Sequence, residues 1–151
     1  MAKLRGKYHY KSGVISAEME IDLGRFEKQY SKAQYELDSA VMEDMVPFMP
    51  MVTGQFINVT KAMSQSVAGS GKVIAAAPPF GRFLYGGKVM VGVTSNSPWA
   101  KSGEKKVITD KNLQYSTGAH PQAQARWFDP TKKKNVKRWV KNVKKTAGGG
   151  K

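Results

Sequence analysis

The apolar and polar positions of the first third of the chain follow two different periods. Over residues 14–23, "VISAEMEIDL", apolar residues alternate with polar ones and the acidic residues fall on one side. Alternation with a period of two predicts a half-buried strand. From Arg25 onward, apolar residues recur every three or four positions, which predicts one face of an α-helix. Pro47 ends this helix, because proline has no amide hydrogen and clashes with the preceding turn. The apolar stripe of the helix is Phe26, Tyr30, Ala33, Leu37, Val41 and Met45.

The middle of the chain combines proline-rich and glycine-rich stretches with short apolar runs. Residues 47–56, "PFMPMVTGQF", fit a rigid apolar loop with a turn or cap at Thr53-Gly54. Residues 55–64 fit a short helix. The apolar run 72–77, "KVIAAA", fits a strand that Pro78-Pro79 ends. The short helix is expected to bury Phe56, Val59 and Met63.

The last third of the chain contains a polar span followed by two helical patterns. Residues 94–118 are rich in glycine, serine and charge, which predicts a long loop or hairpin. Residues 119–128 fit a helix that tolerates Pro121 in its first turn. A final helix is expected to open at Thr131. Its narrow apolar stripe is Val136, Trp139, Val140 and Val143.

Charge is distributed unevenly along this basic chain, whose formal net charge is +14. Residues 14–46 carry eight acidic against three basic residues, and residues 126–151 carry ten basic residues against one acidic residue. Such asymmetry indicates that the basic end meets an acidic surface on nucleic acid or protein. A solvated basic helix without a dedicated partner is the other interpretation. The candidate basic surface is Lys132, Lys133, Lys134, Lys137, Arg138, Lys141, Lys144 and Lys145.

Composition also limits the organisation and the kinds of site. A chain of 151 residues fits one domain, expected over 14–146 between a basic arm (1–13) and a flexible tail (147–151). No apolar run reaches the ~20 residues of a membrane helix, and no signal-peptide core follows the basic start, so an intracellular chain with no membrane partner is expected. Zero cysteines and two histidines argue against a metal site.

Two glycine–lysine pairs raise the question of a phosphate-binding loop. The NTPase motif G-x-x-x-x-G-K-[ST] needs a hydroxyl residue after the lysine and lies between a strand and a helix. Val73 follows Gly71-Lys72, and Val89 follows Gly87-Lys88. Neither pair has the first glycine of the motif. No nucleophile elbow or histidine-supported set of carboxylates appears either. We therefore predict a protein that is not an enzyme, with no catalytic, cofactor-binding or metal-binding residues.

Nucleic acid is an alternative partner for the basic end. A basic helix with aromatic residues nearby can follow phosphates and stack bases. Trp139, however, lies in the apolar stripe of its helix, which favours packing. No zinc-finger, RNA-recognition or helix-turn-helix signature is present. The alternative function is therefore non-sequence-specific nucleic-acid binding through the C-terminal helix.

Motifs in three parts of the chain carry a resemblance to a known family. One is a P-x-x-T-G turn after the long helix, and another is a proline-aromatic segment that ends in Tyr-Gly, with Phe-Gly in place of the usual Tyr-Ala. The third is a late "RWF…KK…W" pattern. Over most of residues 15–145 the chain resembles the minor capsid proteins of tailed phages of Gram-positive bacteria, a branch of the head–tail joining (tail-completion) superfamily. The motif residues expected to be structural are Pro50, Thr53, Gly54, Pro79, Tyr85, Gly86, Trp127, Phe128 and Trp139.

The resemblance implies an α+β fold and a place in a virus particle. The fold would be a small curved antiparallel or mixed sheet packed by the long amphipathic helix and the basic C-terminal helix. The protein would be a structural virion subunit that forms a ring in the phage neck, made in the host cytoplasm. Its partners would be itself, connector or stopper proteins, and the tail terminator or tail tube, with possible non-specific contact to DNA in the lumen. The family has no established catalytic residues or cofactor.

A ring subunit needs two different patches that meet on neighbouring copies. The acidic 14–46 segment and the basic C-terminal end are candidates, because complementary charge fixes register and speeds assembly. The 94–118 span could reach a neighbouring ring and become ordered there. The candidate interface residues are Glu18, Glu20, Asp22, Phe48, Met49, Met51, Trp99, Lys105 and Lys106.

Overall fold

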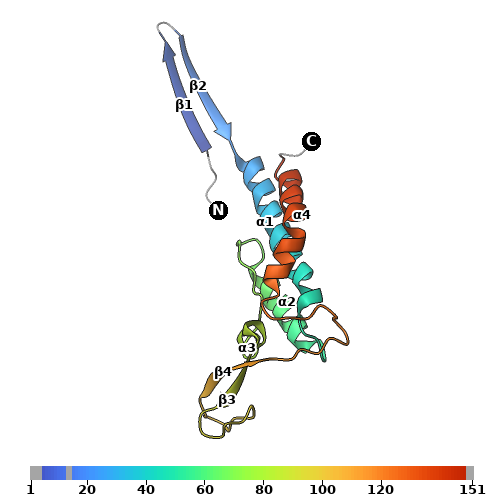
Figure 1. Ribbon diagram of the computed structural model, residues 1–151. Helices are drawn as coiled ribbons and strands as arrows, with labels where there is room; N and C mark the ends of the chain where they lie inside the picture. The colour runs from blue at the N-terminus through green and yellow to red at the C-terminus, as the bar shows by residue number, and fades with distance from the viewer. Residues whose placement is uncertain (1–4, 13–14, 149–151) are drawn as a thin grey trace.

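The protein is elongated, with a helical body between two projecting hairpins (Figure 1). The computed structural model describes residues 5–12 and 15–148, with side chains from Leu23 onward. In that part of the chain no helix is long and apolar enough to cross a membrane. The elements, in order, are β1 (Arg5–Ser12), β2 (Ile15–Asp22), α1 (Gly24–Met45), the 3-10 turn η1 (Val46–Phe48), α2 (Gln55–Val67), α3 (Gly81–Gly86), β3 (Lys88–Gly92), β4 (Lys106–Asn112) and α4 (Phe128–Thr146).

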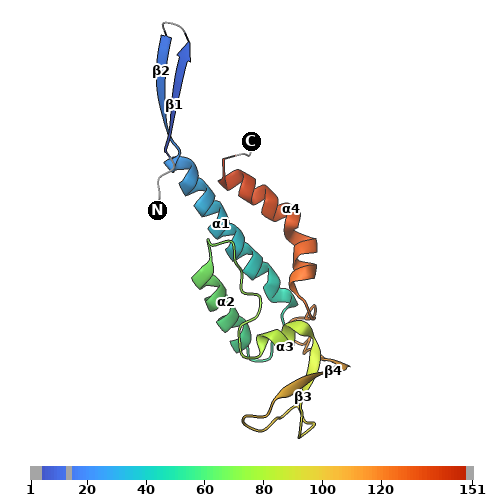
Figure 2. The same cartoon turned by 90° about the vertical axis from the view of Figure 1, so that its left-hand side faces the viewer.

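The α+β class is confirmed, and α1 packs against the C-terminal helix α4 as expected. The strands, however, form two separate two-stranded antiparallel sheets rather than one curved sheet. β1–β2 projects from the N-terminal end of α1, and β3–β4 lies beyond α3 at the other end of the body (Figure 2). Each hairpin pairs strands that are near neighbours in the chain. The apolar faces of the helices are instead buried against other helices.

The long helix begins and ends as the period predicts, but its apolar stripe is covered along only part of its length. Ala33, Val41 and Met45 are buried, whereas Phe26 is half exposed and Tyr30 is 62% exposed. The covered part faces α4, α2 and the segment around residue 73. The first turns of α1 extend toward the β1–β2 hairpin, beyond most of that cover (Figure 2).

Trp127 lies at the centre of the core and is fully buried. The rings of Phe56 and Tyr85 meet it edge-on, with centroids 6.0 and 4.8 Å away. Its indole Nε1 donates a hydrogen bond to the Ala75 carbonyl over 2.9 Å. Edge-to-face pairs of this kind stabilise a core beyond the area that they bury. The buried cluster consists of Val41, Met42, Met45, Phe48, Met49, Ile57, Trp127 and Trp139.

The apolar run 72–77 does not form the predicted strand. It crosses the helices as an irregular segment whose amides bind side-chain hydroxyls of α2. Ile74 N donates to Ser64 Oγ over 3.3 Å, and Ala77 N donates to Thr60 Oγ1 over 3.1 Å. Buried backbone groups need partners, and here α2 supplies them in place of a neighbouring strand. The strand prediction was therefore wrong, and the run instead packs against the core as an irregular segment.

Residues 119–128 do not form the predicted helix either. This stretch runs through turns, and its amides bond to distant carbonyls, since Gln124 N donates to Phe48 O and Arg126 N to Tyr85 O. α4 begins at Phe128, earlier than the predicted start at Thr131. Thr131 is buried inside the first turns, and its hydroxyl donates back to the Trp127 carbonyl over 2.7 Å.

The α2 helix is confirmed, but its buried face was predicted wrongly in part. Ile57, Thr60 and Ser64 are buried, whereas Val59 is exposed. Phe56 and Met63, the other two expected core residues, are half-buried. Threonine and serine face the core because they bind the 72–77 segment, which a purely apolar stripe does not anticipate. In α4, Trp139 is buried, Val143 is half-buried, and Val136 and Val140 are exposed.

Residues 94–118 contain the connecting loop and the second strand of a hairpin whose first strand, β3, lies before this span. β4 lies within this span and pairs with β3, with Gly92 opposite Lys106 and Met90 opposite Ile108. The register shifts between Lys88 and Met90, which marks a bulge in the ladder. Residues 93–105 form the connecting loop at the tip.

Candidate interaction surfaces

Two backbone amides of the glycine-rich loop before residue 72 bind a carboxylate of the same chain, that of Asp38. Asp38, only 3% exposed on α1, accepts hydrogen bonds at Oδ2 from Gly69 N (2.8 Å) and Gly71 N (3.0 Å). Its Oδ1 accepts a third bond from Gln34 Nε2 over 2.8 Å. Both glycines have positive φ, and the amides of these two alternate residues point at one acceptor. The amides that a phosphate would need are therefore bound to Asp38, while Lys72 is exposed to solvent.

The second glycine–lysine pair, Gly87-Lys88, also makes its contacts with other residues of the same chain. Gly87 ends α3 in the left-handed region, and a Cβ there would lie 2.6 Å from the Ala125 Cβ. Lys88 Nζ donates to Asn112 Oδ1 (2.8 Å) and to the Asp110 carbonyl (3.2 Å). This lysine therefore ties β3 to β4.

The described side chains contain no group of three or more histidine, aspartate or glutamate residues that could hold a metal ion. His120 Nδ1 lies 2.8 Å from the Met49 carbonyl, so it ties the loop before α4 to the core. Glu18, Glu20 and Asp22 are strand residues whose backbone alone is described. Their Cα partners in the β1–β2 ladder are His9, Lys7 and Arg5 respectively. The register therefore places the acidic positions of β2 opposite basic positions of the same hairpin.

Two candidate interface residues belong instead to the core. Phe48 is 7% exposed and Met49 is fully buried, because η1 turns them under α1 and α2. Met51 is half-buried against the same cluster. The proline-rich loop is therefore a structural element of the body, and Phe48 and Met49 are not available as a docking surface.

The tip of the β3–β4 hairpin holds the other candidates at the surface. Trp99 is 88% exposed, and Lys105 and Lys106 are exposed beside it. The Glu104 carboxylate accepts hydrogen bonds from three backbone amides, those of Thr94 (2.9 Å), Ser95 (2.6 Å) and Lys101 (2.9 Å). The bonds from Ser95 and then Lys101 are the main reason that the pKa of Glu104 is lowered to about 2.

Further hydrogen bonds order the same loop around the tryptophan. Lys106 Nζ donates to the Pro98 carbonyl over 2.7 Å, and Trp99 N donates to Ser97 Oγ over 3.1 Å. The tip is therefore a network of short-range bonds that fixes the backbone on both sides of an exposed aromatic side chain.

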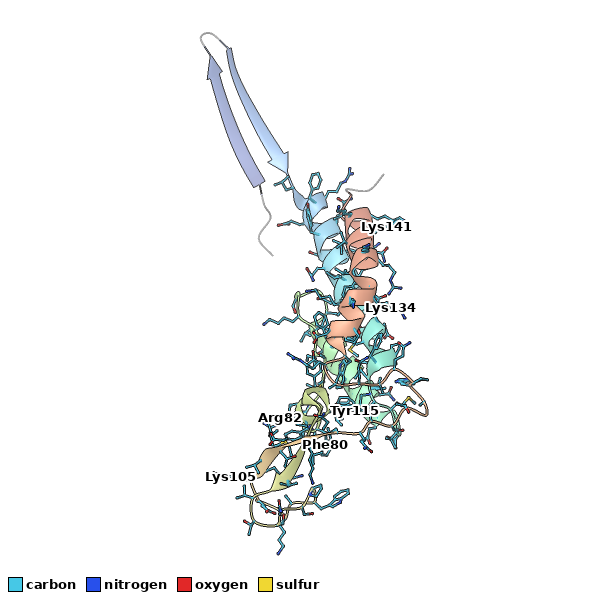
Figure 3. All side chains as sticks on the ribbon, in the orientation of Figure 1. Phe80, Arg82, Lys105, Tyr115, Lys134 and Lys141 are labelled. Carbon is cyan, nitrogen blue, oxygen red and sulfur yellow. The ribbon has the colours of Figure 1, made fainter. Side chains whose placement is uncertain are left out.

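Lysines cover the solvent face of α4, where Lys134 and Lys141 are labelled in Figure 3. All eight residues of the candidate basic surface are exposed. Lys133, Lys137, Lys141 and Lys144 are spaced to share one face, and the run extends ~16 Å at 1.5 Å per residue. None of these four has a hydrogen bond or ion pair with another described residue.

The opposite face of α4 is anchored to α1 through Asp44. The Asp44 carboxylate accepts a hydrogen bond from Trp139 Nε1 over 2.6 Å and forms an ion pair with Arg138. Near the other end of the helix, Thr146 Oγ1 donates to Glu36 over 2.6 Å. Some of the charge complementarity predicted between neighbouring subunits therefore acts between α1 and α4 of one chain.

Most of the motif residues have structural roles. Gly54 precedes α2 with φ +78, and Thr53 Oγ1 accepts a hydrogen bond from Gln55 N. Tyr85 packs against Trp127, and burial raises its pKa. Phe128 packs against the core. Pro50 is half-buried, Pro79 is exposed, and a Cβ at Gly86 would meet no atom within 4 Å.

An apolar groove of about 390 Å³ opens beside the glycine-rich loop. α1 forms one wall with Leu37 and Val41, and Val73 lies in the opposite segment. Gln34 and Asp38 contribute the polar part of the lining, and Tyr85 contributes part of the rest.

Several of the residues that organise these surfaces were missed from the sequence. Asp38 lies three positions before Val41, so the helical period places this acidic residue on the buried face of α1. An acidic residue at a position that should be apolar was a signal that it binds a specific partner. Glu104 had no such signal, because its partners are backbone amides of an irregular loop. Comparison of the chain with protein-family models, curated proteins and solved structures finds no match.

Proposed function

We propose that the chain is a structural subunit of a tailed-phage neck, which forms a ring with copies of itself between the portal-side connectors and the tail. The P-x-x-T-G turn, the Tyr-Gly segment and the late tryptophan pattern support this family assignment. The roles of Tyr85 and Trp127 in the core, and of Gly54 before α2, are compatible with motifs that maintain a fold. The family would not require a catalytic site.

The observation that carries the proposal is the large accessible surface of the chain. It exposes 11428 Å² for a mass of 16.6 kDa, whereas a compact monomer of that mass exposes about 7,600 Å². The difference lies in the range of obligate interfaces, about 2,000–5,000 Å². A subunit shaped by contacts with neighbours has this property, because its projecting parts complete their packing only in the assembly.

The two hairpins are the parts that most need such neighbours. An isolated two-stranded hairpin is only marginally stable in water, and its outer edges leave backbone groups unpaired. In β4, Val107 and Ile108 are both exposed. Exposed apolar residues on an unpaired edge favour association with another chain.

Assembly tests this proposal directly. The full chain is purified alone and also co-expressed with the portal-side connector and tail-tube proteins of the same phage, and each sample is examined by mass photometry and electron microscopy. We expect closed rings that contain several copies of the chain. A chain that remains monomeric alone and with both partners contradicts the proposal.

The unpaired lysines of α4 favour a second candidate function, non-sequence-specific binding of nucleic acid. Each neutralised phosphate contributes about −0.9 to the slope of log K against log salt for duplex DNA. Four lysines on one face therefore predict a slope near −3 to −4 and no sequence preference.

Replacing the four lysines of this face tests whether α4 binds nucleic acid. Glutamine at the four positions should remove most of the affinity and flatten the salt slope, measured by fluorescence anisotropy on a random duplex. A control variant removes four exposed lysines elsewhere and should retain most of the affinity. Equal loss in both variants would indicate net charge rather than a binding face. The control positions are Lys28, Lys72, Lys101 and Lys111.

A further inference from the structure

The loop at the tip of the β3–β4 hairpin holds a tryptophan in solvent in an ordered backbone. Trp99 is the exposed member of the three tryptophans, since Trp127 and Trp139 are buried. Three amide bonds to Glu104 and the Lys106 bond to Pro98 fix the loop around it. A tryptophan on an ordered backbone has few torsions left to fix on binding, and tryptophan is enriched among the residues that dominate interface energies.

The apolar groove beside α1 has the size and chemistry to receive an indole ring. Its volume of about 390 Å³ lies within the range of small-ligand pockets, ~300–1,000 Å³. Leu37, Val41 and Val73 supply apolar walls. A buried indole N–H also needs an acceptor.

Gln34 can supply that acceptor. The Asp38 carboxylate only accepts hydrogen bonds, so the amide nitrogen of Gln34 must face it, over 2.8 Å. The amide oxygen of Gln34 has no hydrogen-bond partner among the described residues. The lining of the groove, which is otherwise largely apolar, therefore includes a residue whose amide oxygen is free to accept a hydrogen bond.

The tip and the groove are far apart in one chain. Lys105, in the same loop as Trp99, lies at the end of the molecule beyond α3 (Figure 3). The groove lies between α1 and the segment around Val73, in the helical body. Both halves of a complementary contact are thus present in every copy, but they can meet only between copies.

We propose that Trp99 of one copy inserts into this groove of a second copy and donates its indole N–H to Gln34 Oε1. The proposal rests on the ring-forming function above and names the contact that would drive it. A second copy is the favoured occupant because the chain carries both the tryptophan and the groove, and because its surface exceeds that of a compact monomer by an interface-sized area. A contact between two different patches is heterologous, and repeated copies of it close into a ring.

Complementation between two defective variants tests the contact. Trp99→Ala removes the indole ring from the tip but leaves the groove intact. Val73→Asp places a charge in the groove but leaves Trp99 intact. We expect each variant alone to self-associate at least tenfold more weakly than the wild type. An equimolar mixture should form a one-to-one heterodimer and nothing larger, because only one functional tip and one functional groove remain.

Matched variants separate this result from misfolding. Val52→Ala removes another highly exposed apolar side chain and should assemble as the wild type does. Gln34→Met keeps the length of the side chain but removes both the acceptor and the bond to Asp38, and should weaken association several-fold. It serves as the groove variant if Val73→Asp does not fold, as judged by circular dichroism and thermal unfolding. Trp99 emission, taken as the difference between wild type and Trp99→Phe, should shift to shorter wavelength on assembly.

The possible outcomes distinguish this contact from the proposed function. If the wild type forms rings and Trp99→Ala forms them equally well, the contact is wrong and the ring function stands. If the wild type stays monomeric alone and with the neck proteins, the ring function is contradicted and the contact falls with it. A mixture that contains only monomers, while the wild type assembles, also overturns the contact.

Discussion

Asp38 Oδ2 lies 2.8 Å from the backbone nitrogen of Gly69 and 3.0 Å from that of Gly71, so one carboxylate of α1 holds two amides of the following loop. The same side chain accepts a bond from Gln34 on its own helix. The loop leads directly into residues 72–77, which cross the core. The position of that segment therefore depends on a charged group buried in the middle of the long helix.

Replacing this carboxylate should destabilise the fold. Asp38→Ala removes three hydrogen bonds at once, and hydrogen bonds to charged groups contribute about 1.5–3 kcal/mol each at most. Gly69 and Gly71 are exposed, so water can replace part of the loss. We expect the free energy of unfolding to fall by about 2–3 kcal/mol in urea titrations. Asp110→Ala, at an exposed position of β4, should change it by less than about 0.5 kcal/mol.

The hydroxyl of Thr60 provides a second link to the same segment. Thr60 is fully buried, and its Oγ1 accepts from Ala77 N and donates to Phe56 O. Thr60→Val keeps the shape but leaves the Ala77 amide without a partner, which costs about 1–3 kcal/mol. Hydrogen exchange at the Ala77 amide should accelerate with the fall in stability. Unchanged exchange and stability would mean that another group replaces the hydroxyl.

The residue before α2 must be glycine because of its backbone conformation, and not because an added side chain would clash. Gly54 has φ +78, and the nearest atom to an added Cβ is Met51 Cε at 3.5 Å. Gly54→Ala should therefore cost about 1–2 kcal/mol, the penalty of the left-handed region for an L-residue. Gly54→Asn should cost less. Gly118→Ala is the control, because a Cβ there meets nothing within 4 Å and its φ is not positive. Equal unfolding midpoints for the two alanine variants would contradict this explanation.

The order of the hairpin tip should depend on acid pH through Glu104. The pKa of this carboxyl is about 2 in the folded loop, below the ordinary value of 4.5. Its contribution to loop order is therefore complete above about pH 4.5 and is lost as the pH falls toward 2. A nuclear magnetic resonance titration should give a midpoint near 2 for Glu104. Glu104→Gln should loosen the loop at neutral pH, and a midpoint near 4.5 in the wild type would contradict the bonding.

Periodicity predicted α1 and α2 well, because a helix is a local structure, but it did not predict the short helix α3 and it predicted a helix over 119–128 that does not form. α1 and α2 have close to the expected bounds, since Pro47 and Gly54 limit them regardless of the rest of the fold. The 72–77 run was different. An apolar run does not reveal whether its amides bind another strand or the hydroxyls of Thr60 and Ser64, which depends on the tertiary arrangement.

The surfaces were less predictable than the helices for the same reason. Apolar residues beside prolines, such as Phe48 and Met49, fit a docking loop and a core turn equally well in sequence, and the structure buries them. The lysines of α4 were placed at the surface correctly, because a narrow apolar stripe leaves the rest of a helix to solvent. Trp99 was predicted as a contact residue, but the bonds that order its loop involve backbone groups that carry no sequence signal.

The length of α1 has a consequence for the dimensions of any assembly. This helix has 22 residues, about 33 Å at 1.5 Å per residue, and the two hairpins project beyond its opposite ends (Figure 1). Because α4 packs along its side, α1 is stiffer than a loop of the same length would be. The number of turns in α1 therefore acts as a spacer that sets how far apart the two projections are held.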